Sequence, residues 1–144
     1  MESEDARMRE ILTRAETVAV VGLSDKPDRD SYQIAEYLQS VGYRVVPVNP
    51  LLVEVLGERS YPDLRSVPSD VRIDIVDVFR RSELVGPIVD EAIARHVPTV
   101  WMQLGVTNPE AATKARKAGL VCYEDLCIRV QHRRLRVPTK GRAP

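Results

Sequence analysis

The sequence has few of the features that mark secreted, membrane-spanning or metal-binding proteins. Its 144 residues include two cysteines and two histidines, whose spacing fits no metal-ligand pattern, so neither a metal site nor a disulfide is expected. Nothing resembles a signal peptide, because the first residues are acidic and no apolar run approaches membrane-spanning length. We therefore expect a cytoplasmic protein with reduced thiols that does not bind a membrane.

The chain also lacks a net charge, since 21 basic residues balance 21 acidic ones. No overall field therefore draws it toward nucleic acid, and no nucleic-acid partner is expected. The charge is uneven, however, because only basic charged residues follow Asp125, namely Arg129, Arg133, Arg134, Arg136, Lys140 and Arg142. This pattern favours a solvated helix face with a frayed end over a polyanion site.

No catalytic combination of side chains is visible. His96 comes at the end of a predicted helix, away from the sheet edge where ligands bind. Cys127 and His132 are five residues apart, which does not place them on one helix face. We therefore expect no catalytic residues and no enzymatic activity.

What is present is a regular alternation of apolar runs and amphipathic segments. Apolar runs typical of strands covered on both faces occur at 17–22, 44–48, 73–79, 99–103 and 120–123. Helical spacing predicts helices at 6–15, 31–41, 83–95, 108–119 and 124–134. The alternation predicts a Rossmann-like, doubly wound α/β fold: a mostly parallel five-stranded sheet with helices on both faces. The expected strand order is 3-2-1-4-5.

The length suits a single domain with a substantial core. Within it, residues 1–16 are expected to form an N-terminal helix of the same domain. Residues 17–135 are expected to form the Rossmann-like unit, and residues 136–144 a flexible basic tail.

In such a sheet the ligand lies outside the carboxyl ends of the strands. The first strand ends at Gly22, where a glycine lets the backbone turn closely beneath a ligand. The start of the following helix offers free N–H groups that favour phosphate, and Lys26 and Arg29 add mobile cations. A long surface loop without a ligand is the alternative interpretation.

Three acidic residues complicate that loop. Asp25, Asp28 and Asp30 would repel phosphate, so we expect them to face solvent or to cap the helix. Asp30 or Ser31 is the expected N-cap, with Gln33 completing a capping box from Asp30.

The loop is not the dinucleotide fingerprint. Gly22 has no partner glycines at the G-x-G-x-x-G positions, and Asn49 replaces the acidic residue expected after the second strand. A neutral side chain there tolerates a free or a phosphorylated ribose. NAD is therefore disfavoured, and phosphorylated nucleotides remain open.

Two later strand ends carry further candidates. Phe79 is placed to lie against a purine and Arg80 to reach a phosphate, although Phe79 could equally close the core and Arg80 face solvent. Gln103 and Gly105 follow the fourth strand, where the distal arm of a ligand would run. The preceding Trp101 and Met102 are expected in the core.

Five segments, in order, resemble the stand-alone coenzyme A-binding proteins. They are Val18–Ser24, Arg44–Pro50, Asp77–Arg81, Val100–Gly105 and Cys127–Arg134, and they lie within Thr17–Leu135. That family is similar to the nucleotide-binding domain of the succinyl-CoA synthetase α subunit. One departure is Leu126, where relatives often have a basic residue before the cysteine.

The resemblance implies a Rossmann-like fold that binds coenzyme A. By position, residues 24–31 would hold the phosphates, Asn49 and Pro50 would flank the nucleotide, and residues 78–80 would contact the adenosine portion. The synthetase's phosphorylated histidine belongs to a second domain that this chain lacks, so its ligase reaction is not expected. The candidate cofactor-binding residues are Gly22, Leu23, Ser24, Lys26, Arg29, Ser31, Tyr32, Asn49, Pro50, Val78, Phe79, Arg80 and Gly105.

The expected function is binding of coenzyme A or an acyl-CoA without catalysis. One alternative is an NAD(P)-binding redox enzyme or sensor, which the missing glycines and acidic residue disfavour. Another is a protein-interaction domain with a vestigial crevice that works through its basic last helix. The sequence identifies no protein partner.

Overall fold

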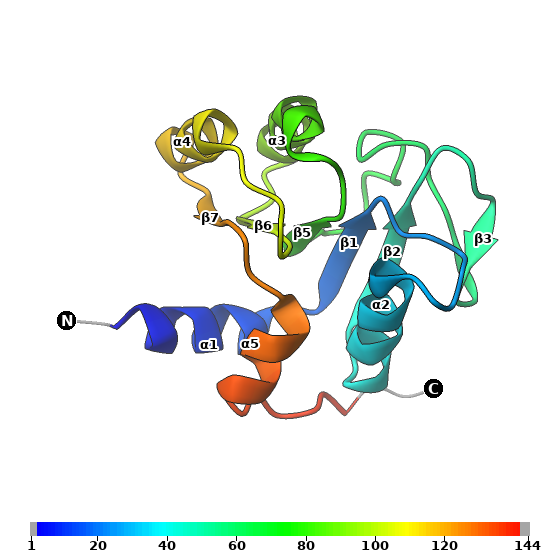
Figure 1. Ribbon diagram of the computed structural model, residues 1–144, viewed down its shortest axis with the longest axis horizontal. Coiled ribbons are helices and arrows are strands. Elements are labelled where there is room, and N and C mark those ends of the chain that lie inside the picture. The colour runs from blue at the N-terminus through cyan, green and yellow to red at the C-terminus, as the bar shows by residue number, and fades with distance from the viewer. Residues whose placement is uncertain (1–2, 142–144) are drawn as a thin grey trace.

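Five parallel strands form the central layer of the computed structural model, which describes residues 3–141 (Figure 1). They are β1 (Thr17–Val21), β2 (Arg44–Val48), β5 (Ile75–Val78), β6 (Thr99–Met102) and β7 (Val121–Tyr123). Every residue of β1, β5 and β6 is buried, because helices cover both faces of the sheet. The predicted Rossmann-like α/β fold is confirmed.

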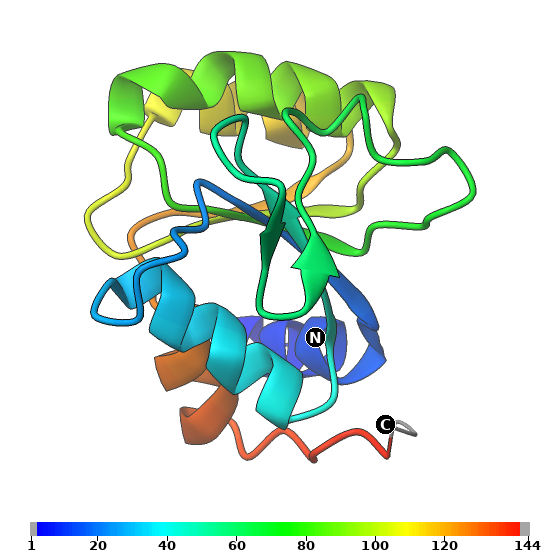
Figure 2. The ribbon, with the colours of Figure 1, turned by 90° about the vertical axis from the view of Figure 1, so that its right-hand side faces the viewer.

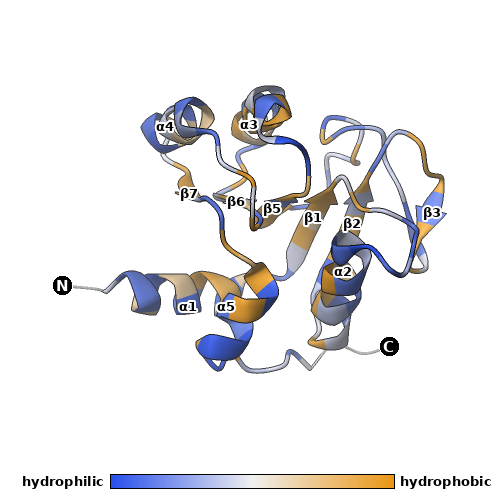
Figure 3. Cartoon of the chain, in the orientation of Figure 1, coloured by the Kyte–Doolittle hydropathy of each residue, from blue (hydrophilic) through white to orange (hydrophobic). Residues whose placement is uncertain are grey.

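The helices are divided between the two faces of the sheet. α1 (Glu4–Arg14), α2 (Asp30–Ser40) and α5 (Ile128–Arg134) cover one face, and α3 (Val85–Ala94) and α4 (Pro109–Lys117) cover the other (Figure 2). Because side chains alternate along a strand, Val18 and Val20 enter the first core while Ala19 and Val21 enter the second. The apolar strands between helices with polar outer faces are visible in Figure 3.

The strand order differs from the predicted one. The sheet runs β2-β1-β5-β6-β7, so the third long strand pairs with β1 and not with β2. Pro47 gives the physical reason, since proline has no N–H to donate within a sheet. Its carbonyl faces away from β1 and accepts the Tyr61 N–H at 3.1 Å. Pro47 therefore favours an edge position for β2. The same residue is the sequence feature that argues against the order 3-2-1-4-5, in which the second strand is central.

A short hairpin beyond β2 was not predicted. It consists of β3 (Glu54–Val55) and β4 (Glu58–Arg59), joined by Leu56 and Gly57. Both loop residues have positive φ, 54° and 77°. Such two-residue loops are usually marked by Asn-Gly or Asp-Gly, and a leucine in the first position hides the turn.

Most helix ends agree with the sequence pattern. Gly42 follows α2 with φ of 99°, and the N–H of Tyr43 closes the helix by donating to the Leu38 carbonyl. The Asn108 side chain accepts the Ala111 N–H at 3.0 Å and caps α4. The predicted helix at 83–95 instead begins with a short 3-10 turn at Ser82–Leu84, and α3 follows it.

The last helix starts later than predicted. α5 begins at Ile128 and not at Glu124, because the preceding backbone is held by β6 and by the loop that follows it. The N–H of Leu126 donates to the Met102 carbonyl at 3.2 Å, and Asp125 has a φ of 57°. Residues 124–127 therefore continue along the edge of the sheet before the chain turns into α5.

The described part of the predicted basic tail makes packed contacts. Val137 is buried, and the backbone N–H of Lys140 donates to the Val41 carbonyl at 2.8 Å. The Lys140 ammonium donates to the Thr13 carbonyl, which connects the segment to α1. Arg142 lies outside the described residues. Within residues 3–141, no helix has both the length and the apolar character needed to cross a membrane.

A buried histidine connects α5 to α2. Nδ1 of His132 lies 2.6 Å from the Tyr37 hydroxyl, and its ring makes edge contacts with Tyr37 and Tyr43. Nε2 has no hydrogen-bond partner among the described residues. Burial lowers the pKa of His132 below its ordinary 6.5, and the positive charges of Lys140 and Arg133 lower it further.

We predict that acidification destabilises the fold through His132. In the unfolded chain His132 takes up a proton as the pH drops through about 6.5, whereas the buried ring of the folded protein stays neutral to lower pH. The free energy of unfolding therefore falls as the pH drops below about 6.5. Urea unfolding at about pH 7.5 and about pH 5.5 should show a loss on the order of 1 kcal/mol that His132→Gln lacks. Equal losses in both proteins would show that this ring does not carry the effect.

Candidate ligand site at the N-terminus of α2

Gly22 directly follows β1 and passes against Phe79, the residue that directly follows β5. It has a φ of 88°, and its N–H donates to the Val48 carbonyl at 2.8 Å. A Cβ at this position would stand 2.5 Å from the Phe79 carbonyl oxygen. Only glycine therefore lets the chain leave β1 while passing this close to the end of β5.

The loop that follows Gly22 folds back onto the first turn of α2. The N–H of Ser24 donates to Oγ of Ser31 at 3.0 Å, and the N–H of Lys26 donates to Oγ of Ser24 at 3.1 Å. The Gln33 amide donates to the Pro27 carbonyl at 3.2 Å. Three side-chain bonds thus hold a loop that the sequence shows only as polar and rich in charge.

The predicted capping of α2 is wrong. The N-cap residue is Arg29, whose side chain makes no capping bond, and Asp30 is already the first helical residue. Gln33 does not complete a capping box because its amide bonds the Pro27 carbonyl, and the Ser31 hydroxyl is engaged by Ser24. No side chain therefore caps the N-terminus of α2, where helix geometry favours an anion.

These elements enclose a hollow of about 380 Å³, called here the α2 hollow. It is lined by Gly22, Ser24, Lys26, Arg29, Asp30, Ser31 and Phe79. Six of the seven are predicted cofactor-binding residues. The seventh, Asp30, was expected with Asp25 and Asp28 to face solvent or to cap the helix, and all three are exposed. Backbone N–H groups beside two mobile cations favour a phosphate group over a neutral ligand.

Two predicted residues have side chains inside the protein. Leu23 is fully buried in the core beneath α2, and Val78 is fully buried in the core beneath α3. Neither side chain lines the α2 hollow, so a ligand contact with either residue would have to use its backbone. The Leu23 carbonyl already accepts the Asn49 amide at 3.0 Å.

Asn49 has a structural task that the sequence did not indicate. Its Nδ2 bonds the Leu23 carbonyl, and its Oδ1 accepts the Leu51 N–H at 2.9 Å. The side chain therefore fixes the end of β2 against the loop after β1. Pro50 follows it and is exposed. Direct contact of either residue with a nucleotide stays a prediction.

Three further predicted residues, Tyr32, Arg80 and Gly105, are not among the residues that line the α2 hollow. Tyr32 is half-buried against the core beneath α2. Arg80 is exposed, and its Cδ would lie 3.0 Å from a Cβ on Gly22, which places its stem beside that glycine. Gly105 is exposed on the turn after β6, outside the residues that line the hollow. Their ligand contacts also stay predictions.

The turn after β6 is held in place by hydrogen bonds to the segment before α5 and to the start of α5. The Gly105 N–H donates to Oδ1 of Asp125 at 2.7 Å, and Oε1 of Gln103 accepts the Ile128 N–H at 3.0 Å. Gln103 is thus a buried structural residue, although the sequence placed it beside a ligand arm. Leu104 at the tip is 71% exposed. Trp101 and Met102 are buried, as predicted.

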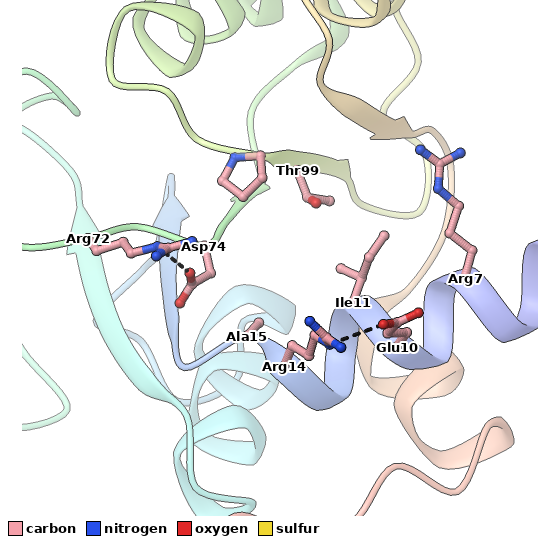
Figure 4. Close-up of a pocket in the computed structure, with 9 residues that line it drawn as sticks. Arg7, Glu10, Ile11, Arg14, Ala15, Arg72, Asp74 and Thr99 are labelled. Carbon is pink, nitrogen blue, oxygen red and sulfur yellow. Dashed lines mark ion pairs between the residues drawn. The ribbon is translucent and has the colours of Figure 1, made fainter.

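A second hollow, of about 390 Å³, lies at the opposite end of the sheet between α1 and the starts of β5 and β6 (Figure 4). Arg14 pairs with Glu10 at 3.1 Å, and Arg72 pairs with Asp74 at 3.3 Å. Asp74 also accepts the N–H of Thr17. These charges are engaged within the protein, and ligands of parallel sheets bind at the carboxyl edge. The α2 hollow is therefore the stronger candidate.

Reactive side chains are poorly placed for catalysis at the α2 hollow. His96 is exposed. It comes two residues before Pro98, which lines the second hollow, so it lies at the amino-terminal edge of the sheet. Burial raises the pKa of the Cys122 thiol to about 11, which disfavours the reactive thiolate. Among residues 3–141 no group of three or more His, Cys, Asp or Glu side chains is arranged to hold a metal ion.

Comparison with known proteins agrees with the geometry. Residues 16–133 match the model of a family described as the CoA binding domain. The uncharacterized protein YneT of Bacillus subtilis (strain 168) is 42% identical over 127 residues, which cover 88% of this chain and 93% of YneT.

Solved structures show the same arrangement. A hypothetical protein from Pyrococcus horikoshii OT3 is 39% identical, with a TM-score of 0.88 and coverage of 94% of this chain and 99% of that one. A dinucleotide-forming acetyl-coenzyme A synthetase of Ca. Korarchaeum cryptofilum is 25% identical with a TM-score of 0.68. The match covers 78% of this chain but only 26% of the synthetase, so it corresponds to one part of that larger protein.

We predict that Gly22→Ala destabilises the protein by about 1–3 kcal/mol, because the new Cβ meets the Phe79 carbonyl and φ is positive. Gly119→Ala is the matched control, since Gly119 has a similar φ of 90° but nothing within 4 Å of an added Cβ. It should cost about 1 kcal/mol from the positive φ alone, and the cost at Gly22 should exceed it. Urea unfolding measures both. Equal effects of the two substitutions would contradict the close approach of β1 and β5.

Proposed function

The chain belongs to the coenzyme A-binding domain family, and we propose that it binds coenzyme A or an acyl-CoA as a module without catalytic activity of its own. The phosphates of the ligand occupy the α2 hollow, with Lys26 and Arg29 closing over them. The adenosine portion lies toward Phe79 and Arg80, and the distal arm extends along the carboxyl edge of the sheet.

The observation that carries this proposal is the combination found at the α2 hollow. Gly22 brings the backbone close without a side chain, no side chain caps the helix, and Lys26 and Arg29 supply positive charge. Each feature alone is common at protein surfaces. Together, at the carboxyl edge of a parallel sheet, they favour a phosphate-bearing ligand.

The absence of catalysis is supported by where the reactive groups lie. His132 is engaged with Tyr37 inside the core, and Cys122 is a buried thiol. A nucleophile needs a base within hydrogen-bond distance, and no such pair lines the α2 hollow. On this proposal the protein carries, senses or delivers its ligand and leaves the chemistry to another protein.

We predict that coenzyme A binds the protein more tightly than dephospho-coenzyme A, NAD or ATP. Loss of affinity for the dephospho form would show that the 3′-phosphate is recognised. Isothermal titration with each ligand at matched concentration measures the order. Tighter binding of NAD would favour a redox function, and no heat with any of the four would favour an interaction domain.

The charges can be tested by a double variant. Lys26→Gln with Arg29→Gln removes both cations while keeping side-chain length, and affinity for coenzyme A should fall about tenfold or more. Lys117→Gln, on an exposed residue at the end of α4, is the control and should bind like the parent protein. Unchanged binding by the double variant would place the phosphates elsewhere.

A further inference from the structure

Asp77 is a buried acid in the middle of the sheet. It belongs to β5, in register with Val20 of β1 and Trp101 of β6. Its exposed fraction is 0%, and neither carboxyl oxygen has a hydrogen-bond partner among the described residues. Because Val76 and Val78 enter the core beneath α3 and α4, the alternation directs Asp77 to the face covered by α1, α2 and α5.

The α2 hollow lies at the carboxyl end of β1 and β5, close to Asp77. Phe79 comes two residues after Asp77, directly after the end of β5, and lines the hollow. Gly22 follows Val20, the strand partner of Asp77, by two residues. Strand spacing and rise put the Cα atoms of Asp77 and Gly22 about 8 Å apart. Gly22 has no side chain, so it adds nothing to the packing between the carboxyl and the hollow.

The surroundings of Asp77 contain no charge that would stabilise a carboxylate. Burial alone raises its pKa well above the ordinary value, and no neighbouring charge contributes. The titratable groups in or against the same core come from α2, the segment after it, β7, and α5 with its N-cap: Tyr32, Tyr37, Tyr43, Tyr123, Cys127 and His132. The inward residues of α1 are the apolar Met8 and Leu12. The neutral carboxylic acid is therefore the form that the fold favours.

We propose that Asp77 controls the charge of the ligand site, which binds its phosphate-bearing ligand while Asp77 is a neutral carboxylic acid and releases it when Asp77 ionises. This inference rests on the function proposed above. The carboxyl and a phosphate beside Gly22 are on the order of 10 Å apart, about one Debye length, and a buried charge is weakly screened. At an effective dielectric constant of about 20, repulsion over that distance reduces affinity about fifteenfold for each unit of phosphate charge.

The proposal implies that binding takes up a proton wherever Asp77 is partly ionised. The ligand's negative charge favours the protonated acid, so the pKa of Asp77 rises further in the complex. The proton comes from solvent and resides on the Asp77 carboxyl, with no covalent change in the ligand. Asp77 acts here through the field at the hollow and needs no contact with the ligand.

Titration of coenzyme A into the parent protein and into Asp77→Asn, from about pH 6.5 to about pH 9.5, tests the proposal. The parent should lose at least about tenfold in affinity as the pH rises, while Asp77→Asn, which stays neutral, keeps its affinity. The other titratable groups are common to both proteins and cancel in the ratio. Circular dichroism at each pH confirms that both are folded, and Asp77→Leu replaces the asparagine variant if that does not fold.

The outcomes separate the two proposals. Parallel pH profiles with tight binding by both proteins would overturn the role of Asp77 and leave coenzyme A binding intact. No binding by either protein at any pH would overturn the proposed function, and the role of Asp77 with it. Proton uptake by the parent alone, measured in buffers of different ionisation enthalpy, would support the proposal independently of affinity.

Discussion

The contact between the ends of β1 and β5 is the constraint on which the rest of the site depends. The Gly22 N–H bonds the Val48 carbonyl, while the Phe79 carbonyl occupies the space that any larger residue at position 22 would need. This contact brings the loop after β1, the end of β2 and the start of the chain after β5 to one point. The N-terminus of α2 then lies beside it, uncapped and next to Lys26 and Arg29.

The site is thus built from backbone and glycine more than from side chains. Asn49, Ser24 and Ser31 use their polar atoms to hold loops in place. Lys26 and Arg29 supply positive charge, and Asp77 is the one acidic residue in the five parallel strands of the described sheet. A site of this kind depends on backbone geometry that many sequences can provide, which agrees with solved structures that share the fold at 25% and 39% identity.

The sequence was sufficient for features that depend on local pattern. Apolar runs located all five long strands, Gly42 and Asn108 located helix ends, and Gly22 located the close turn after β1. These features follow from the period of apolar residues and from backbone conformations that few residue types adopt. Six residues of the α2 hollow were found because strand ends of a parallel sheet meet at one edge.

Features that depend on distant contacts were missed. Ser31 does not cap α2 because Ser24 engages it, and α5 starts late because Met102 and Gly105 hold the segment before it. Leu56 concealed a hairpin whose turn usually carries asparagine. The strand order could have been inferred from Pro47, which belongs at an edge, whereas the structural role of Gln103 depends on a helix twenty-five residues away.

The central claim is that the α2 hollow binds the phosphates of coenzyme A. Amide chemical shifts recorded by NMR during a titration with coenzyme A test it most directly. We expect the largest shifts at the amides of residues 22–32 other than Pro27, and of Phe79 and Arg80. Saturable binding that leaves those amides unchanged, with shifts instead around Arg14 and Arg72 at the opposite end of the sheet, would contradict it.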